Sequence, residues 1–263
     1  MGDKMDLKAA GSISVAGGEY GEVKTSASLK VNGDLKCDNL SCSGSAKVAG
    51  DLECAGKVAC SGSLAVDGAI QTTDASISGS FSVGGSVTVA GLLRVSGSVK
   101  TGQDLTAKEA KISGSCRLGG QLKGGELKIS GSLRAQGVEA ERFLSSGVLD
   151  VEGLVNAEEM EIRVNGTSKA GDLGGSTIRV LDGATNGSGI TVFGVQIISI
   201  GVRHGFLTAG NIEGDEVELE CTTAQVVRGR NVRIGRNCNI DRVEYTDSLT
   251  VDEYAEVKEQ VRV

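Results

Sequence analysis

A short motif, an apolar residue followed by Ser-Gly and usually a second Ser, returns along this chain at an almost constant interval. Its Ser-Gly pairs begin at Ser43, Ser61, Ser78, Ser96, Ser113, Ser130 and Ser146, so each step is seventeen or differs from it by one. A second column keeps the same interval, at Gly33, Gly50, Gly68, Gly85, Gly102 and Gly119. A constant interval of this length is typical of solenoids, in which each repeat buries its apolar face only against its neighbours.

The spacing inside each repeat predicts short strands joined by glycine corners. Gly44, Gly50, Gly56 and Gly62 are six residues apart, which divides a repeat into three sides. In the stretch ELKISGSLRA, apolar residues alternate with polar ones, as on a strand with one buried face. The inward positions then form a column from coil to coil, at Cys42, Cys60, Ile77, Val95, Ile112 and Ile129. The sequence therefore predicts an all-β, three-sided parallel β-helix of about 17 residues per coil, right-handed as parallel connections usually are.

An odd number of residues per coil has a consequence for the corners. Three sides of six residues would keep the inward and outward alternation around a full turn, whereas sides of 6, 6 and 5 cannot. We therefore expect one corner in each coil to carry a residue out of alternation, as a β-bulge does.

The second part of the chain differs in composition but keeps the count. We expect residues 1–164 to form a Gly/Ser-rich β-helical array, and residues 165–263 to continue it as a Val/Ile/Arg/Glu-rich array with an irregular start. Seventeen-residue steps link Leu173 to Ile190 and Val180 to Ile197. The same step recurs in four later sets: Ile200, Val217, Ile234 and Val251; Cys221, Cys238 and Ala255; Val226 and Val243; and Ile240 and Val257.

Composition and charge limit the partners. The chain has 40 Gly, no Pro and 3% aromatic residues, which fits a thin core of small aliphatic side chains. A formal net charge of −7 disfavours nucleic-acid binding, and Arg228, Arg230, Arg233 and Arg236 are expected to be scattered outward arginines. No apolar run reaches the length of a membrane span. We expect a cytoplasmic protein, with at most peripheral association at the inner face of the cell membrane.

The seven cysteines include no CxxC pair, which disfavours a structural zinc site. Cys37 and Cys54, Cys42 and Cys60, and Cys221 and Cys238 are each one repeat apart, so each pair is expected to be stacked in one column. Small, buried, reduced thiols are favoured over disulfides, which the spacing also permits, and over a metal. No metal or cofactor is expected.

One enzymatic alternative stays open at His204, the single histidine. Left-handed β-helix acyltransferases of the hexapeptide type use a histidine as general base, and VRIGRNCNI at 232–240 resembles their repeat. The odd-numbered coil and the lack of a placeable carboxylate partner argue against it. The chain is therefore expected not to be an enzyme, and no catalytic residue is assigned.

The [I/V/C]-S-G-S units, the short coils and the closing stretch VVRGRNVRIGRNCNIDRVEY at 226–245 resemble the bactofilin family of polymer-forming bacterial cytoskeletal proteins. The resemblance implies end-to-end polymerisation without nucleotide, and a scaffold role in cell shape, polar organisation, envelope synthesis or motility. The chain departs from the family in its longer array and in lacking Pro-bearing tails and a short apolar membrane-targeting segment.

The ends of a solenoid favour polymerisation on physical grounds, because an end coil exposes a strand edge and an open core. We predict that stacking of copies covers the apolar residues of both ends, with Asp252, Glu253 and Glu256 limiting uncontrolled edge pairing. The predicted interface comprises Leu7, Ile13 and Val15 at one end and Leu249, Val251, Val257, Val261 and Val263 at the other. Expected partners are further copies of the chain and protein clients. The Ser-Gly-Ser face, with Ser113 and Ser130, is a candidate lateral contact.

Overall fold

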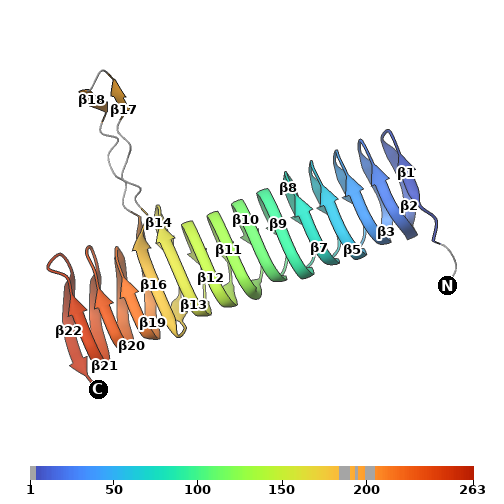
Figure 1. The fold of residues 1–263 in the computed structure, drawn as a ribbon. Helices are drawn as coiled ribbons and strands as arrows, with labels where there is room; N and C mark the ends of the chain where they lie inside the picture. Colours follow the sequence, from blue (N-terminus) through green and yellow to red (C-terminus); the bar gives the residue numbers. More distant parts are fainter. Residues whose placement is uncertain (1–3, 184–189, 193–194, 199–204) are drawn as a thin grey trace. The chain divides into compact units, whose positions relative to one another are not determined.

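The computed structural model describes residues 4–183, 190–192, 195–198 and 205–263. The chain divides into two compact units, Met1–Arg142 (unit 1) and Phe143–Val263 (unit 2). The described residues contain strands and no helix, and they form a parallel β-solenoid with about 17 residues per turn. The predicted fold class is thus confirmed. Figure 1 shows the strands of successive turns stacked beside one another within each unit.

The strands of unit 1 are β1 (Leu7–Ala9), β2 (Ile13–Thr25), β3 (Leu29–Cys42), β4 (Ala46–Val48), β5 (Leu52–Cys60), β6 (Leu64–Val66), β7 (Ile70–Ile77), β8 (Ser80–Val83), β9 (Val87–Thr101), β10 (Leu105–Leu118) and β11 (Gln121–Ala135). The boundary between the units falls within β12 (Gly137–Val151). Those of unit 2 are β13 (Leu154–Val164), β14 (Thr167–Lys169), β15 (Asp172–Gly174), β16 (Thr177–Asp182), β17 (Ile190–Val192), β18 (Val195–Ile198), β19 (Phe206–Leu219), β20 (Thr222–Ile234), β21 (Asn239–Val251) and β22 (Glu256–Arg262).

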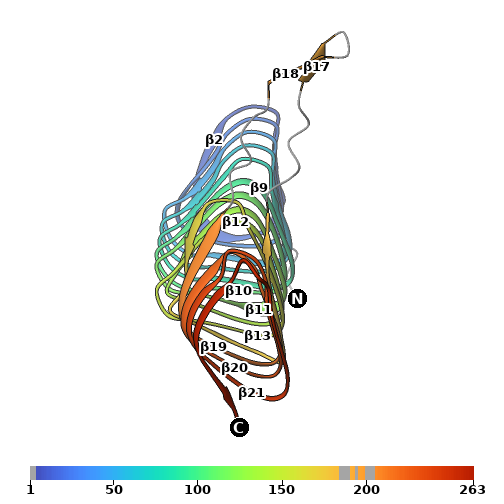
Figure 2. The same ribbon diagram turned by 90° about the vertical axis from the view of Figure 1, so that its left-hand side faces the viewer.

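Each turn of unit 1 has three paired segments, which we call its first, second and third faces. In the turn of β3 they are residues 29–31, 35–37 and 40–42, which pair with residues 46–48, 52–54 and 58–60 of the next turn. The inward column from Cys42 to Ile129 is confirmed, because each member is the register partner of the next. Figure 2 shows these turns from the end, each as a closed loop.

The odd residue lies at one corner, between the second and third faces. In the turn of β3, five residues separate the start of the second face, Leu35, from the start of the third, Leu40. In the next turn six residues separate Leu52 from Val58, so the register between the two turns shifts at this corner. Residues 35, 37, 40 and 42 are all buried, so the alternation breaks between Cys37 and Leu40. The expected break in alternation is thus confirmed for the turn of β3, whereas the turn of β5, with six residues at this corner, keeps the alternation.

Small aliphatic side chains fill the interior of each unit. The inward positions are almost fully buried; Val31, for example, is 0% exposed and Leu52 is 1% exposed. The largest fully buried side chains are those of Phe81 in unit 1 and Phe143 in unit 2. In the part of the chain that is described, no buried side-chain nitrogen or oxygen lacks a hydrogen-bond partner. The core is therefore thin, apolar and dependent on neighbouring turns.

Two kinds of glycine corner allow the turns to stack closely. At the Ser-Gly-Ser corner, between the third and first faces, Gly114 has a φ of 124°, and a Cβ there would overlap the carbonyl oxygen of Gly97. At the corner between the first and second faces, the backbone N–H of Asp51 donates to Oδ1 of Asp34 at 2.8 Å. A Cβ on Gly50 would overlap that carboxylate. Each corner therefore excludes side chains for a different reason.

Unit 2 departs from the predicted count in two places. Residues 167–182 form β14, β15 and β16 in regular parallel register with β13 and with β12. On the other side, Leu173 pairs with Ile212 and Val180 with Leu219, so the ladder passes over the segment between them. The expected steps from Leu173 to Ile190 and from Val180 to Ile197 are therefore wrong. The residues between 183 and 205 are an insertion, whose described strands β17 and β18 form a separate antiparallel pair.

The turns after the insertion are also shorter than predicted. Val217 pairs with Val232 and Leu219 with Ile234, so the expected pairing of Val217 with Ile234 is wrong by two positions. Val243 pairs with Val227 and not with Val226. The predicted step returns between Ile234 and Val251 and between Ile240 and Val257. The turn that begins at Leu207 places five residues from each face to the next, so that its alternation restarts at every corner.

Candidate functional site

The first turn of unit 1 exposes apolar residues that later turns bury. Ile13 pairs with Leu29 and Val15 with Val31, which makes all four inward positions. Leu29 and Val31 are 2% and 0% exposed, whereas Ile13 and Val15 are half-buried. Leu7, the partner of the buried Val23, is also half-buried. The first turn therefore leaves one side of its interior open.

The last turn of unit 2 repeats this loss of burial. Leu249 and Val251 pair with Val232 and Ile234, which are 2% and 0% exposed. Leu249 and Val251 are themselves half-buried. Val257 is half-buried too, although its partner Ile240 is fully buried. At both terminal turns, inward apolar residues are thus less buried than their partners in the adjacent turn.

Two residues of the predicted interface lie on the outer surface instead. Val261 pairs with Glu244, while Gln260 takes the position beside the buried Val243. Val263 is 71% exposed and lines a groove on unit 2. The apolar residues that the structure places at the two ends are therefore six of the eight predicted ones: Leu7, Ile13, Val15, Leu249, Val251 and Val257.

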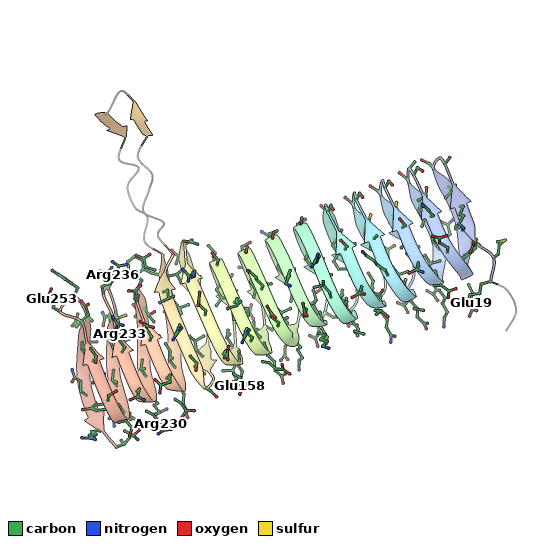
Figure 3. All side chains as sticks on the ribbon, in the orientation of Figure 1. Glu19, Glu158, Arg230, Arg233, Arg236 and Glu253 are labelled. Carbon is green, nitrogen blue, oxygen red and sulfur yellow. The ribbon has the colours of Figure 1, made fainter. Side chains whose placement is uncertain are left out.

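Two exposed residues at the terminal turns were missed by sequence reasoning. Met5 is 66% exposed next to the first turn, where its carbonyl oxygen accepts the N–H of Gly21 at 3.0 Å. Tyr254 is 71% exposed in the last turn, and its N–H donates to Oδ1 of Asp252 at 2.9 Å. Neither residue belongs to an alternating pattern, so only its size and its position near an end could have indicated it. Asp252, Glu253 and Glu256 are exposed around Tyr254, and Figure 3 shows Glu253 projecting from this turn.

The backbone at both terminal turns is paired on one side only. Residues 13–16 pair with β3, and residues 248–251 pair with β20; no second ladder to either segment occurs among the residues described. Free N–H and C=O groups along a strand are a template for a further parallel strand. Open edges therefore coincide with the half-buried apolar positions.

Unit 2 has an open groove of about 720 Å³ on its surface. Its floor contains Gly175, Gly214 and Gly229 on successive turns, and a Cβ on Gly214 would lie 2.6 Å from the carbonyl oxygen of Gly175. The groove exists because these positions carry no side chain. The acids Glu213 and Asp215 are exposed on its wall.

The four arginines of the 228–236 stretch each pair with an acid of a neighbouring turn. Nε of Arg228 lies 2.7 Å from Glu244, and Nη2 of Arg230 lies 3.3 Å from Asp247. Arg233 pairs with Glu218 at 3.3 Å, and Arg236 pairs with Asp182 and Glu220. Figure 3 shows Arg230, Arg233 and Arg236 on the outer surface. These arginines point outward, as predicted, but they are not scattered, because each forms an ion pair with another turn.

All seven cysteines are free and buried. Cys37 and Cys54 are register partners, as are Cys42 and Cys60, which confirms the stacking of those two pairs. The third pairing is wrong, because the ladder places Asn239 beside Thr223 and so sets Cys238 next to Thr222 instead of Cys221. Burial raises the pKa of the Cys116 and Cys238 thiols to about 12, which disfavours the reactive thiolate.

Two sequence candidates remain, the single histidine and a metal site. His204 lies outside the described residues. Among the residues that the structure describes, no group of three or more His, Cys, Asp or Glu side chains could hold a metal ion. Nor does the described part of the chain include a helix long and apolar enough to cross a membrane.

Comparison with known proteins finds two relatives in Bacillus subtilis (strain 168). The chain is 34% identical to the uncharacterized protein YhbF over 112 residues, 42% of both chains. It is 34% identical to the uncharacterized protein YhbE over 114 residues, 43% of this chain and 44% of that one. The matched stretch thus spans less than half the length of either relative. No model of a protein family matches the chain, and no solved structure matches it.

Proposed function

We propose that this protein is a structural scaffold of the bactofilin type, whose copies stack end to end into filaments without a bound nucleotide. One observation carries the proposal: the inward apolar columns lose their burial at both terminal turns. Each half-buried Ile, Leu or Val has on the order of 1 kcal/mol still to gain from full burial. Ile13, Val15, Leu249 and Val251 together provide a favourable contact, with the open backbone ladders adding to it.

A second copy is the partner that fits these ends best. Within unit 1, every turn already covers the turn before it with aliphatic side chains in the same three segments. The last turn of unit 2 presents the same kind of surface, with Leu249 and Val251 in one segment and Val257 in another. Joining the first turn of one copy to the last turn of another continues a stacking rule that both ends already follow. Because the two joined ends are different surfaces, such contacts do not close into a ring. They therefore generate a filament.

The cellular setting follows from the same proposal. A nucleotide-independent filament in the cytoplasm, in contact with protein clients or peripherally with the inner face of the cell membrane, would serve cell shape, polar organisation or motility. The inward side chains that lose burial at the two ends are aliphatic, which supports a structural role for these surfaces.

Electron microscopy of the purified full chain tests the proposal, with Val15→Glu and Val251→Glu as variants. Each variant places a charge at one end only, so each should abolish filaments, because an unpaired carboxylate in an apolar contact is costly. Val261→Glu is the matched control, since Val261 lies on the outer surface beside Glu244, and it should polymerise like the wild type.

A mixture of the two end variants sharpens the result. Each variant keeps one intact end, so the mixture should form dimers but no filaments. Filaments that persist in both variants, or a wild type that stays monomeric at high concentration, would overturn the proposal.

A further inference from the structure

The outward residues around the Ser-Gly-Ser corner of unit 1 form a continuous surface, which we call the ridge. Each of seven successive turns contributes four outward positions, two on either side of the corner glycine or its equivalent. The rows are Lys24, Ser26, Ser28 and Lys30; Ser41, Ser43, Ser45 and Lys47; Ala59, Ser61, Ser63 and Ala65; Ser76, Ser78, Ser80 and Ser82; Arg94, Ser96, Ser98 and Lys100; Lys111, Ser113, Ser115 and Arg117; and Lys128, Ser130, Ser132 and Arg134. The crest of this convex edge is serine in every turn.

The ridge is positively charged, although unit 1 as a whole is nearly neutral. Unit 1 has 16 Lys and Arg against 15 Asp and Glu; nine of the cations and none of the acids lie on the ridge. On the ridge, Lys47 lies 3.6 Å from Asp67 and Lys111 lies 3.5 Å from Glu109. Within the described residues, Arg94, Lys100 and Arg117 have no ion pair, and Lys128 has none either. The positive charge of these four side chains therefore remains available to a partner.

The last three rows concentrate this charge. The stretches RVSGSVK, KISGSCR and KISGSLR are in register, so that Arg94, Lys111 and Lys128 form one column. Lys100, Arg117 and Arg134 form a second column on the other side of the serines. Neighbouring turns are about 4.8 Å apart, which brings six cations into a stretch of three turns.

The complementary surface lies on unit 2 of the same chain. Unit 2 carries 19 Asp and Glu against 11 Lys and Arg, so its excess charge is negative. Its groove has a floor of Gly175, Gly214 and Gly229, where nothing obstructs an approaching edge. On the wall, Glu213 and Asp215 are exposed and form no close ion pair among the described residues, although Glu213 lies beside Arg228 of the next turn. Arg228 and Arg230, which also line the groove, are already paired with Glu244 and Asp247.

We propose that the ridge of one copy docks into the unit 2 groove of another, as a lateral contact between filaments. Serines form the crest of the ridge and glycines the floor of the groove, so that the two backbones can approach closely. The flanking cations of the ridge then meet Glu213 and Asp215. Both surfaces repeat at the spacing of stacked strands, which allows contacts on successive turns to form together.

This inference deepens the proposed scaffold role and rests on it, but the two can be tested separately. The ridge variant Lys100→Glu/Arg117→Glu should form single filaments of normal length that no longer associate side by side. The groove variant Glu213→Lys/Asp215→Lys should lose bundles in the same way. Low-speed sedimentation measures bundles, and high-speed sedimentation with electron microscopy measures single filaments.

Charge exchange identifies the partner. A protein that carries both pairs of substitutions should regain bundles, because each reversed surface meets its reversed counterpart. Lys36→Glu/Lys123→Glu is the matched control: it makes the same change of charge on the second face of unit 1, where these lysines pair with Glu53 at 2.8 Å and Glu139 at 3.0 Å. That control should bundle normally, and bundles of the wild type should dissolve as salt rises.

Three results would overturn the inference. The first is normal bundling by the ridge variant, and the second is failure of the exchanged protein to regain bundles. The third is bundling of wild-type filaments only when polyphosphate or anionic phospholipid vesicles are added, because the ridge would then serve an external polyanion or a membrane. Salt-sensitive lateral dimers in the Val15→Glu background would support the inference even if filaments did not form.

Discussion

The two units follow the same stacking rule but organise their outer surfaces differently. Unit 1 has small residues along one corner and leaves most of the neighbouring cations without an ion pair. Unit 2 links its outward charges between turns, as in the pairs of Arg228 with Glu244 and of Arg233 with Glu218. Exposed pairs of this kind contribute little to stability. Both units therefore depend on the apolar interior for stability, and differ chiefly in what their surfaces offer to other molecules.

The largest expected effect concerns the close stacking at the Ser-Gly-Ser corner of unit 1. Gly114→Ala should lower the free energy of unfolding by about 2–4 kcal/mol, because φ is positive and the carbonyl oxygen of Gly97 occupies the space of a Cβ. Chemical denaturation followed by circular dichroism measures the change.

Two control variants distinguish the effect of close stacking from the effect of replacing a glycine as such. Gly11→Ala changes the same corner in the first turn, where a Cβ would meet nothing within 4 Å, and it should have little effect. Gly174→Ala in unit 2, with Asn156 Oδ1 3.2 Å away as the nearest atom, should cost about 1 kcal/mol or less. Equal losses at Gly11 and Gly114 would contradict the stacking account.

The buried thiols predict the next largest effect, in alkaline solution. The pKa of Cys116 in unit 1 and of Cys238 in unit 2 is raised from 9.0 to about 12 by burial. Each contribution to stability is complete below pH 9 and is lost as pH rises towards 12, because the unfolded chain ionises first. By pH 11 each thiol should reduce the free energy of unfolding by about 2–3 kcal/mol.

Matched variants assign this alkaline loss to the two units. Cys116→Val and Cys238→Val should each flatten the pH dependence by a similar amount, as measured by denaturation at pH 8 and pH 11. An unchanged slope in either variant would show that burial of that thiol does not control it.

The corner carboxylates predict a smaller effect that both units should share. Asp104 Oδ1 accepts the N–H of Gln121 at 2.7 Å in unit 1, and Asp172 Oδ1 accepts the N–H of Asn211 at 2.7 Å in unit 2. Replacing either aspartate with Ala should cost about 1–2 kcal/mol, because an N–H at the corner loses a charged acceptor. Replacement with Asn, which keeps an acceptor oxygen, should cost less. If Asn and Ala were equivalent, the hydrogen bond would not be the cause.

The smallest effect should come from the exposed ion pairs of unit 2. Hydrogen bonding to Arg228 holds the pKa of Glu244 below its usual value, so any contribution is present above pH 4.5 and is lost as pH falls further. Arg228→Ala should shift the acid limb of the stability curve slightly at low salt and not at high salt. Lys100→Ala in unit 1, which breaks no ion pair, should leave that limb unchanged.

The regular part of the fold could be predicted from the sequence, because the corner glycines and the inward residues of unit 1 recur at steps of 17 or 18. The step itself indicated where alternation must fail. Unit 2 was harder to predict, because the predicted step separates Val217 and Ile234 only by coincidence, while the ladder pairs Val217 with Val232. A one-dimensional count cannot distinguish a long insertion from a full turn when both contain Val and Ile.

The candidate site was predictable to the extent that it follows from alternation. Ile13, Val15, Leu249 and Val251 were found at the ends because they continue inward columns. The inference failed for Val261, because the seventeen-residue step leads to it from the outward Glu244 and not from the inward Val243. The ridge needed the register of all seven turns, since no single row reveals that nine cations and no acids share one edge.

Negative-stain electron microscopy of the wild-type full chain beside Val15→Glu tests the central claim most directly. The account predicts filaments that lengthen with protein concentration in the wild type and single particles in the variant at every concentration. Wild-type particles that remain single at high concentration and moderate salt would contradict the account.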